Sequence, residues 1–149
     1  MKAILFCLLL GITLCYNANN AISYARRYCG NYNPSYANYR NMGGDCANFV
    51  SQCLKAGGLD LSGCNVSWRD NFGCLPRVVD LQSCLSQLGW KQSTGLPGGF
   101  RAGYPFFIPN THAMIATGVS GSTITYCGHT RDRCDATMGA PGNYYYYYQ

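Results

Sequence analysis

The stretch from Gly43 to Leu54, Gly-Gly-Asp-Cys-Ala-Asn-Phe-Val-Ser-Gln-Cys-Leu, constrains the fold of this chain more than any other part. Two glycines lead into Asp45, which can accept hydrogen bonds from the free amides of a starting helix. Apolar residues then recur at the spacing of a helix with one buried face: Cys46, Phe49, Val50, Cys53, Leu54 and Gly57. The pair Gly57-Gly58 is a natural stop. The sequence therefore predicts a helix that begins after Asp45 and ends near Gly57.

Cys46 occupies the first turn of this predicted helix. Unpaired amides and the dipole at a helix N-terminus stabilise an anion and lower the pKa of a thiol, which favours a thiolate nucleophile. Two considerations oppose catalysis: cysteine is often a buried apolar residue or half of a disulfide, and the carboxylate of Asp45 would repel a thiolate. Cys53 lies two turns further on, about 10 Å away by helical rise, so it cannot bridge to Cys46 and is expected to be a core thiol.

The first 15 residues are typical of an export signal. Lys2 supplies a positive charge, residues 3–14 form an apolar run too short to span a bilayer, and small residues precede a cleavage site near Cys15. We therefore predict a signal peptide over residues 1–15 and a single domain over residues 16–149 that is secreted to the extracellular space. An uncleaved anchor is the alternative.

Cleavage near Cys15 would leave eight of the ten cysteines, which in a small secreted domain indicates a disulfide framework. Because eight is an even number, two arrangements of the cysteines remain open. All eight can pair, which would make Cys46 structural. Otherwise Cys46 and Cys53 are both free, and three bridges form among the remaining six: Cys29, Cys64, Cys74, Cys84, Cys127 and Cys134. The sequence does not choose among the pairings of these six.

The chain carries little charge for its length. Charged residues make up 11% of it, 13 residues are tyrosine, and loss of Lys2 with the signal lowers the formal net charge from +5 to +4. This modest excess favours anionic partners such as bacterial walls only weakly, and it does not indicate a nucleic-acid partner. We expect a monomer that has no membrane partner once the signal is cleaved.

Hydrophobic spacing predicts two further helices, over Ala18–Tyr28 and Val78–Trp90. Short β-rich runs follow, and we expect strands over Tyr104–Ile108, Ala113–Val119, Ser122–Cys127 and Tyr144–Tyr148, with a flexible tail as the alternative for the last. Helices followed by antiparallel strands indicate the α+β class, with the Cys46 helix packed on a small sheet. The pattern Asn65-Val66-Ser67 is an acceptor for N-glycosylation in an exported chain.

Two histidines, His112 and His129, are the candidate bases. His112 opens one predicted strand and His129 follows the next, so the two side chains converge at one end of the sheet if these strands are neighbours. A cysteine at a helix N-terminus, a histidine on a strand and a polar group that orients the histidine make up the arrangement of thiol acyl-transfer enzymes. Surface or structural positions for both histidines are the alternative.

A zinc site built from His112, His129, Cys127 and Cys134 is less well supported. The chain has no Cys-x-x-Cys pair, an oxidising compartment disfavours free thiols, and we expect Cys127 and Cys134 to form a loop-closing disulfide. Paired catalytic carboxylates are also disfavoured, because the chain has only six acidic residues. We expect neither a metal nor a cofactor.

The Gly43–Leu54 stretch, with Tyr16-Asn17 before it and Ala56-Gly57-Gly58 after it, resembles the Putative amidase domain family of the NlpC/P60-like, papain-fold superfamily. Later blocks of the family fit at three further places: Trp68, Thr111–Ile115 and Gly128–Asp132. The resemblance covers essentially all of the chain after the signal, and it implies a papain-like fold. It departs from the family at Gly103-Tyr104-Pro105, where members often have Gly-Asp, and in its additional cysteines.

The resemblance also implies roles for individual residues. Cys46 would be the nucleophile, His112 the general base and His129 the polar residue that orients His112. Because the gap between the histidines is longer than in the commonest members, Thr125 and Tyr126 compete for the orienting role.

The oxyanion would be held by the backbone amide of Cys46, with Asn41 or Tyr39 as the second donor. Cys53 lies inside the matched helix block, so the resemblance also favours a free thiol at that position.

The function implied is that of a secreted cysteine amidase or peptidase that cleaves amide bonds through a thioester and has peptides, notably those of bacterial peptidoglycan, as substrates. Such an enzyme would be antibacterial. One alternative is a thiol transpeptidase on the same fold. The other is a non-catalytic, disulfide-stapled protein that binds glycans or cell walls through its tyrosines, and a disulfide at Cys46 would favour it.

Overall fold

The computed structural model describes residues 15–149, which form three helices followed by six strands. The helices are α2 (Ala18–Tyr28), α3 (Cys46–Ala56) and α4 (Val78–Gln87). The strands are β1 (Lys91–Ser93), β2 (Pro105–Ile108), β3 (His112–Ser120), β4 (Thr123–Gly128), β5 (Arg133–Gly139) and β6 (Tyr145–Tyr148). This order confirms the predicted α+β class.

The strands form one sheet in the order β1-β6-β2-β3-β4-β5, in which every neighbouring pair is antiparallel. The tyrosine run at the end of the chain is therefore an interior strand and not a flexible tail. Tyr146 is fully buried, and its ring stacks on that of Phe106 with the centroids 5.8 Å apart. The rings of Tyr146 and Tyr147, successive residues on opposite faces of the strand, are both buried, which explains why this tyrosine-rich segment is ordered.

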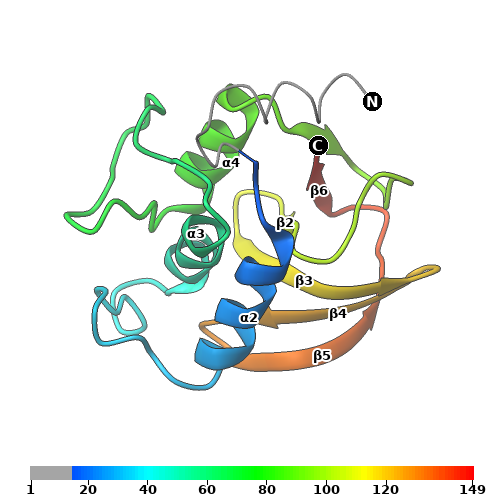
Figure 1. Ribbon diagram of the computed structural model, residues 1–149, viewed down its shortest axis with the longest axis horizontal. Coiled ribbons are helices and arrows are strands. Elements are labelled where there is room, and N and C mark those ends of the chain that lie inside the picture. Colours follow the sequence, from blue (N-terminus) through cyan, green and yellow to red (C-terminus); the bar gives the residue numbers. More distant parts are fainter. Residues whose placement is uncertain (1–14) are drawn as a thin grey trace.

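Helix α3 lies between α2 and α4 and also contacts β3 and β4 (Figure 1). All its residues from Cys46 to Leu54 are buried, so the helix is surrounded and does not present only one apolar face. Its buried polar side chains are hydrogen-bonded, as burial requires. The Ser51 hydroxyl bonds the backbone of Leu75, and the Gln52 carbonyl oxygen accepts from the hydroxyl of Tyr24 at 2.7 Å.

The end of one helix and two strands differ from the prediction. Helix α4 ends at Gln87 and not at Trp90, because Gly89 adopts a left-handed backbone (φ 85°) that stops the helix. Strand β1 has three residues and a polar sequence, and β5 is a mostly exposed edge strand. Neither strand buries enough apolar side chains to leave an alternating pattern in the sequence.

Two disulfides join described residues, Cys29–Cys134 and Cys64–Cys84. The expected Cys127–Cys134 bridge is wrong, because Cys127 is fully buried in the core and Cys134 reaches the end of α2 instead. Among residues 15–149 the free cysteines are Cys46, Cys53, Cys74 and Cys127. Cys53 is fully buried, which confirms the predicted core thiol. Two bridges therefore form where one alternative counted three among the six cysteines outside α3.

Within the described part of the chain, no helix is long and apolar enough to span a membrane. The predicted signal peptide lies outside the described residues except for Cys15. Its cleavage and the secretion of the chain stay predictions.

Candidate active site

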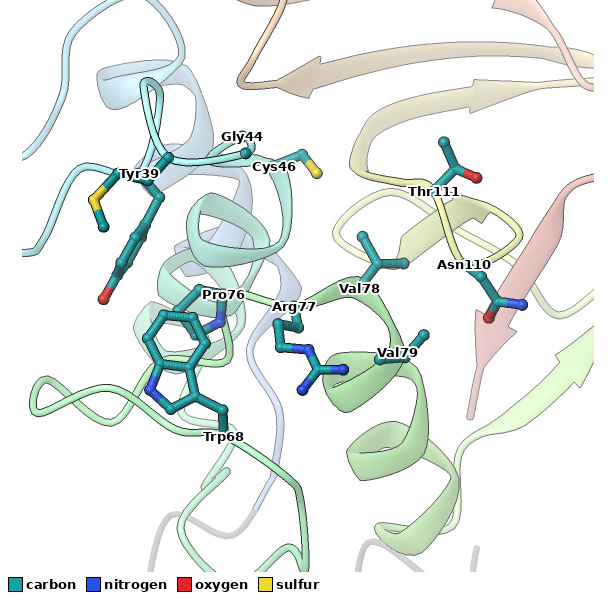
Figure 2. Close-up of a pocket in the computed structure, with 12 residues that line it drawn as sticks. Tyr39, Gly44, Cys46, Trp68, Pro76, Arg77, Val78, Val79, Asn110 and Thr111 are labelled. Carbon is teal, nitrogen blue, oxygen red and sulfur yellow. The ribbon is translucent and has the colours of Figure 1, made fainter.

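Cys46 is the first residue of α3 and borders an open cleft of about 370 Å³ (Figure 2). The thiol is free and the residue is 7% exposed, and Figure 2 shows its sulfur turned into the space that faces Thr111. The described residues that line the cleft are Tyr39, Met42, Gly43, Gly44, Cys46, Trp68, Pro76, Arg77, Val78, Val79, Asn110 and Thr111. A cleft of this size is at the small end of the range for ligand sites, about 300–1,000 Å³.

The double glycine before α3 is required by its backbone. Gly43 and Gly44 both have left-handed backbones, with φ angles of 102° and 115°. A side chain at Gly44 would also place its Cβ 3.0 Å from the hydroxyl oxygen of Thr130. Glycine alone combines this backbone with such a close approach. The pair thus delivers Cys46 into the cleft directly beside Thr130.

Asp45 does not cap α3 with its side chain, so the predicted cap is wrong. One carboxylate oxygen accepts from the backbone N–H of Tyr39 at 2.9 Å and from the side-chain amide of Asn48 at 2.8 Å. The other oxygen is 2.7 Å from Nδ1 of His129. Because these donors stabilise the negative charge of the Asp45 carboxylate, this charge repels a thiolate at Cys46 less than an unpaired carboxylate would.

His129 is 1% exposed, and both its ring nitrogens face acceptors. Nδ1 donates to Asp45, and Nε2 donates to the carbonyl oxygen of Tyr28, the last residue of α2, at 2.7 Å. Because a carbonyl oxygen only accepts, Nε2 carries a proton, and a further proton between Nδ1 and Asp45 joins the ring to the carboxyl group. The dipole at the C-terminus of α2 favours positive charge on the ring. The ring is stacked between Tyr32 at 4.2 Å and Phe49 at 3.9 Å.

These contacts leave His129 no nitrogen with which to orient His112. The predicted orienting role of His129 therefore does not fit the geometry. His129 instead holds the side chain of Asp45 in place. Asp45 directly precedes Cys46, so His129 helps to position the start of α3.

His112 begins β3, and β4 beside it ends at Gly128, so the two histidines do follow neighbouring strands to the same end of the sheet. Burial and, to a lesser degree, the charge of Arg131 lower the pKa of His112. The ring is therefore neutral at neutral pH and able to take a proton. The backbone of the next residue, Ala113, lies close enough to Cys46 to lower the pKa of its thiol, so the start of β3 lies near the thiol.

The thiol of Cys46 has a pKa above the ordinary value, because burial outweighs four hydrogen bonds that lower it. Those bonds come from the backbones of Ala113, Ala47 and Cys46 and from the side chain of Thr130. The helix N-terminus acts in the expected direction, but the predicted net lowering of the pKa is wrong. The thiol is therefore neutral at rest, so a base must take its proton when the sulfur reacts.

Thr130 was not among the residues expected in the site. Its φ angle is 80°, a left-handed backbone that is a clear outlier for a β-branched residue. Its hydroxyl accepts from the backbone N–H of Asp45 at 3.1 Å, which leaves the hydroxyl proton for the Cys46 sulfur. Strain of this kind gathers at functional sites. The one sequence signal was its place within the Gly128–Asp132 block.

The other candidates for the orienting role do not contact His112. The Thr125 hydroxyl accepts from the Thr117 hydroxyl at 3.2 Å, and the ring of Tyr126 packs against Phe106 at 5.9 Å. The imidazole of His112 has no hydrogen-bond partner among the described residues, Cys46 included. Catalytic hydrogen bonds often tighten only when a substrate binds.

The two candidates for a second oxyanion donor differ in position. Tyr39 lines the cleft, but its hydroxyl donates to Asp70 at 3.2 Å and its backbone N–H to Asp45. Asn41 is exposed and does not line the cleft. The backbone N–H of Ala113 is a better-placed second donor, because the backbone of this residue lies near the thiol.

Within residues 15–149 no group of three or more histidine, cysteine or acidic side chains could hold a metal ion. Cys134, one ligand of the zinc alternative, is bound in the disulfide with Cys29.

Comparisons with known proteins find matches to part of this chain. The model of the family described as "Putative amidase domain" matches residues 15–97, which include Cys46 but neither histidine. The "Uncharacterized protein YhbB" of Bacillus subtilis (strain 168) is 40% identical over 48 residues, 32% of this chain and 14% of that protein. The chain therefore spans a small part of that relative's length. A search of solved structures gives no match.

Replacement of the buried His129 ring is expected to destabilise the fold strongly. His129→Ala leaves the carboxylate of Asp45 buried without its charged partner, which typically costs about 3–5 kcal/mol. Urea unfolding measures this loss, with His112→Ala as the control, because His112 has no hydrogen bond to lose and should cost about 1 kcal/mol. Equal losses in the two variants would contradict the ion pair.

Removal of the Thr130 hydroxyl is expected to make the Cys46 thiolate harder to form. Thr130→Val keeps the side-chain shape but removes a donor that lowers the pKa of Cys46, so the alkylation profile moves to higher pH. At a fixed pH below the pKa, alkylation by iodoacetamide should slow by about tenfold, the size of one hydrogen bond to a charged group. Thr130→Ser should restore the rate, and Thr130→Gly should be as slow as Thr130→Val although it relieves the backbone strain. Equal rates in the serine and valine variants would rule out the hydroxyl's role.

Proposed function

We propose that this chain, which belongs to the Putative amidase domain family, is a cysteine amidase or peptidase with Cys46 as nucleophile and His112 as general base. Membership of the family supports amide hydrolysis, and the site supports the cysteine mechanism. The observation that carries the proposal is the free thiol of Cys46, which lies on the first residue of α3, borders the cleft and lies near the backbone of Ala113, the residue after His112.

The reaction follows from the resting state of the site. As the Cys46 sulfur attacks the amide carbonyl carbon, the neutral ring of His112 takes the thiol proton. The backbone amides of Cys46 and Ala113 hold the negative oxygen that forms. Collapse of this intermediate breaks the C–N bond, and the imidazolium returns the proton to the leaving amine. Water then attacks the thioester with His112 as base, which releases the acid and the thiol.

Thr130 contributes to the first of these steps as a positioning residue. Since burial raises the pKa of Cys46, the thiolate needs help at the moment that it forms. The Thr130 hydroxyl, fixed by the N–H of Asp45, supplies a donor that does not have to reorganise.

The substrates we propose are amide bonds in bacterial peptidoglycan peptides, met outside the cell after secretion. Three features support this proposal: the resemblance to NlpC/P60-like proteins, the exposed aromatic ring of Trp68 on the cleft, and the positive net charge of +4 after loss of Lys2, which weakly favours anionic wall polymers. The order of a nucleophile helix followed by a base on an antiparallel sheet is consistent with a papain-like fold.

A binding protein without activity is the weaker alternative. A disulfide at Cys46 would have favoured it, whereas Cys46 is a free cysteine. A buried free thiol at the edge of a cleft has no evident use in a surface that only binds glycans.

Hydrolysis of isolated peptidoglycan and of its soluble peptides is the test. Release of new amino groups should fall by about 1,000-fold or more in Cys46→Ala and in His112→Ala, as for other nucleophile and base losses. Cys53→Ala, two turns along the same helix, is the matched control and should retain activity. Activity that survives in Cys46→Ala would refute the proposal, and products that contain a new amide in place of a free acid would show a transpeptidase.

A further inference from the structure

We propose that the cleft beside Cys46 recognises a carboxylate on the substrate and that Arg77 binds it. This inference rests on the proposed function, because it defines which amides reach the thiol. Among the described residues that line the cleft, Arg77 alone carries a full charge. A cleft with a single cation selects ligands that bring an anion to it.

The guanidinium of Arg77 is held at one edge and free at the other. Its Nε lies 3.6 Å from a carboxylate oxygen of Asp80, and the side chain of Arg77 makes no hydrogen bond with any described residue. Figure 2 shows the guanidinium directed into the space between Trp68 and Val79. The two terminal nitrogens therefore present the fork that binds a carboxylate through two parallel hydrogen bonds.

Asp80 orients Arg77 without competing for the cleft. Its side chain is 5% exposed, does not line the cleft, and accepts from the backbone N–H of Ser67 at 2.9 Å. The Arg77 side chain, in contrast, is 52% exposed. A ligand in the cleft thus meets the guanidinium and not the carboxylate behind it.

The backbone next to Arg77 adds to the same preference. Arg77 is the N-cap residue of α4, and no side chain caps this helix. The first amides of α4 belong to Val78 and Val79, both of which line the cleft. Uncapped amides and the positive end of the dipole favour an anion there.

The rest of the cleft limits the ligand to a small amphipathic group. Trp68 and Val79 are 41% and 40% exposed and give the cleft apolar surface on either side of Arg77 (Figure 2). Asn110, on the turn between β2 and β3, lines the cleft with a side-chain amide that has no hydrogen-bond partner among the described residues. The class that fits is a peptide whose residue beside the scissile amide carries a free carboxylate.

Thiol probes test the carboxylate site without any need for hydrolysis. Maleimidopropionic and maleimidohexanoic acids, each paired with its carboxamide, place a carboxylate at two distances from the sulfur that they alkylate. Labelling of Cys46, located by peptide mass spectrometry, should favour one of the acids over its amide by about three- to tenfold at low salt, and salt should weaken the preference.

The preference should disappear in Arg77→Gln and shrink in Arg77→Lys, which keeps the charge beside Asp80 but loses the fork. Arg101→Gln removes an equal charge from an exposed residue outside the cleft and should change nothing. Equal acid-to-amide ratios in the unaltered protein and in Arg77→Gln would overturn the inference, and Arg77 would then be a solvated partner of Asp80 only.

Peptide pairs that differ only in a carboxylate or carboxamide beside the scissile amide separate this inference from the proposed function. Faster cleavage of the acid, lost in Arg77→Gln, supports both. Equal cleavage of the two peptides by the unaltered protein overturns the carboxylate site and leaves the amidase. A labelling preference without cleavage of any peptide overturns the amidase and leaves the carboxylate site.

Discussion

The buried pair of Asp45 and His129 is the interaction on which the rest of the site depends. Through hydrogen bonds it joins the end of α2 at Tyr28, the loop at Tyr39 and the start of α3 to the residue that follows β4. A charged pair at 1% exposure is costly to desolvate, and it persists here because further hydrogen bonds and two stacked rings surround it. Its position directly before Cys46 makes it a support for the nucleophile.

The Asp45–His129 pair helps to hold the backbone around the Cys46 thiol in a strained and buried conformation. Gly43, Gly44 and Thr130 all have left-handed backbones at the place where the chain enters α3. This geometry brings the Thr130 hydroxyl against Cys46, while burial keeps the thiol protonated at rest. The proposed activation by a neutral His112 agrees with these pKa directions, whereas a permanent thiolate and imidazolium would need the opposite shifts in pKa.

The sequence predicted those parts of the site that regular periodicity and local chemistry define. Helix α3 and the first-turn position of Cys46 follow from apolar spacing and paired glycines, and His112 and the end of β4 follow from β-rich runs. The partners of His129 could not be read in this way, because residues 84 positions apart meet only through the tertiary fold. The polar edge strand β5 and its disulfide to α2 were missed for the same reason.

We propose that Cys46 forms a covalent thioester with the acyl half of an amide substrate. Acid-quenched reactions with peptidoglycan peptides, followed by intact mass measurement and peptide mapping, test it most directly. We expect an adduct with the mass of the acyl fragment on Cys46, which hydroxylamine removes and which is absent from Cys46→Ala. Amide products that form in Cys46→Ala, or an acyl adduct on any other residue, would contradict it.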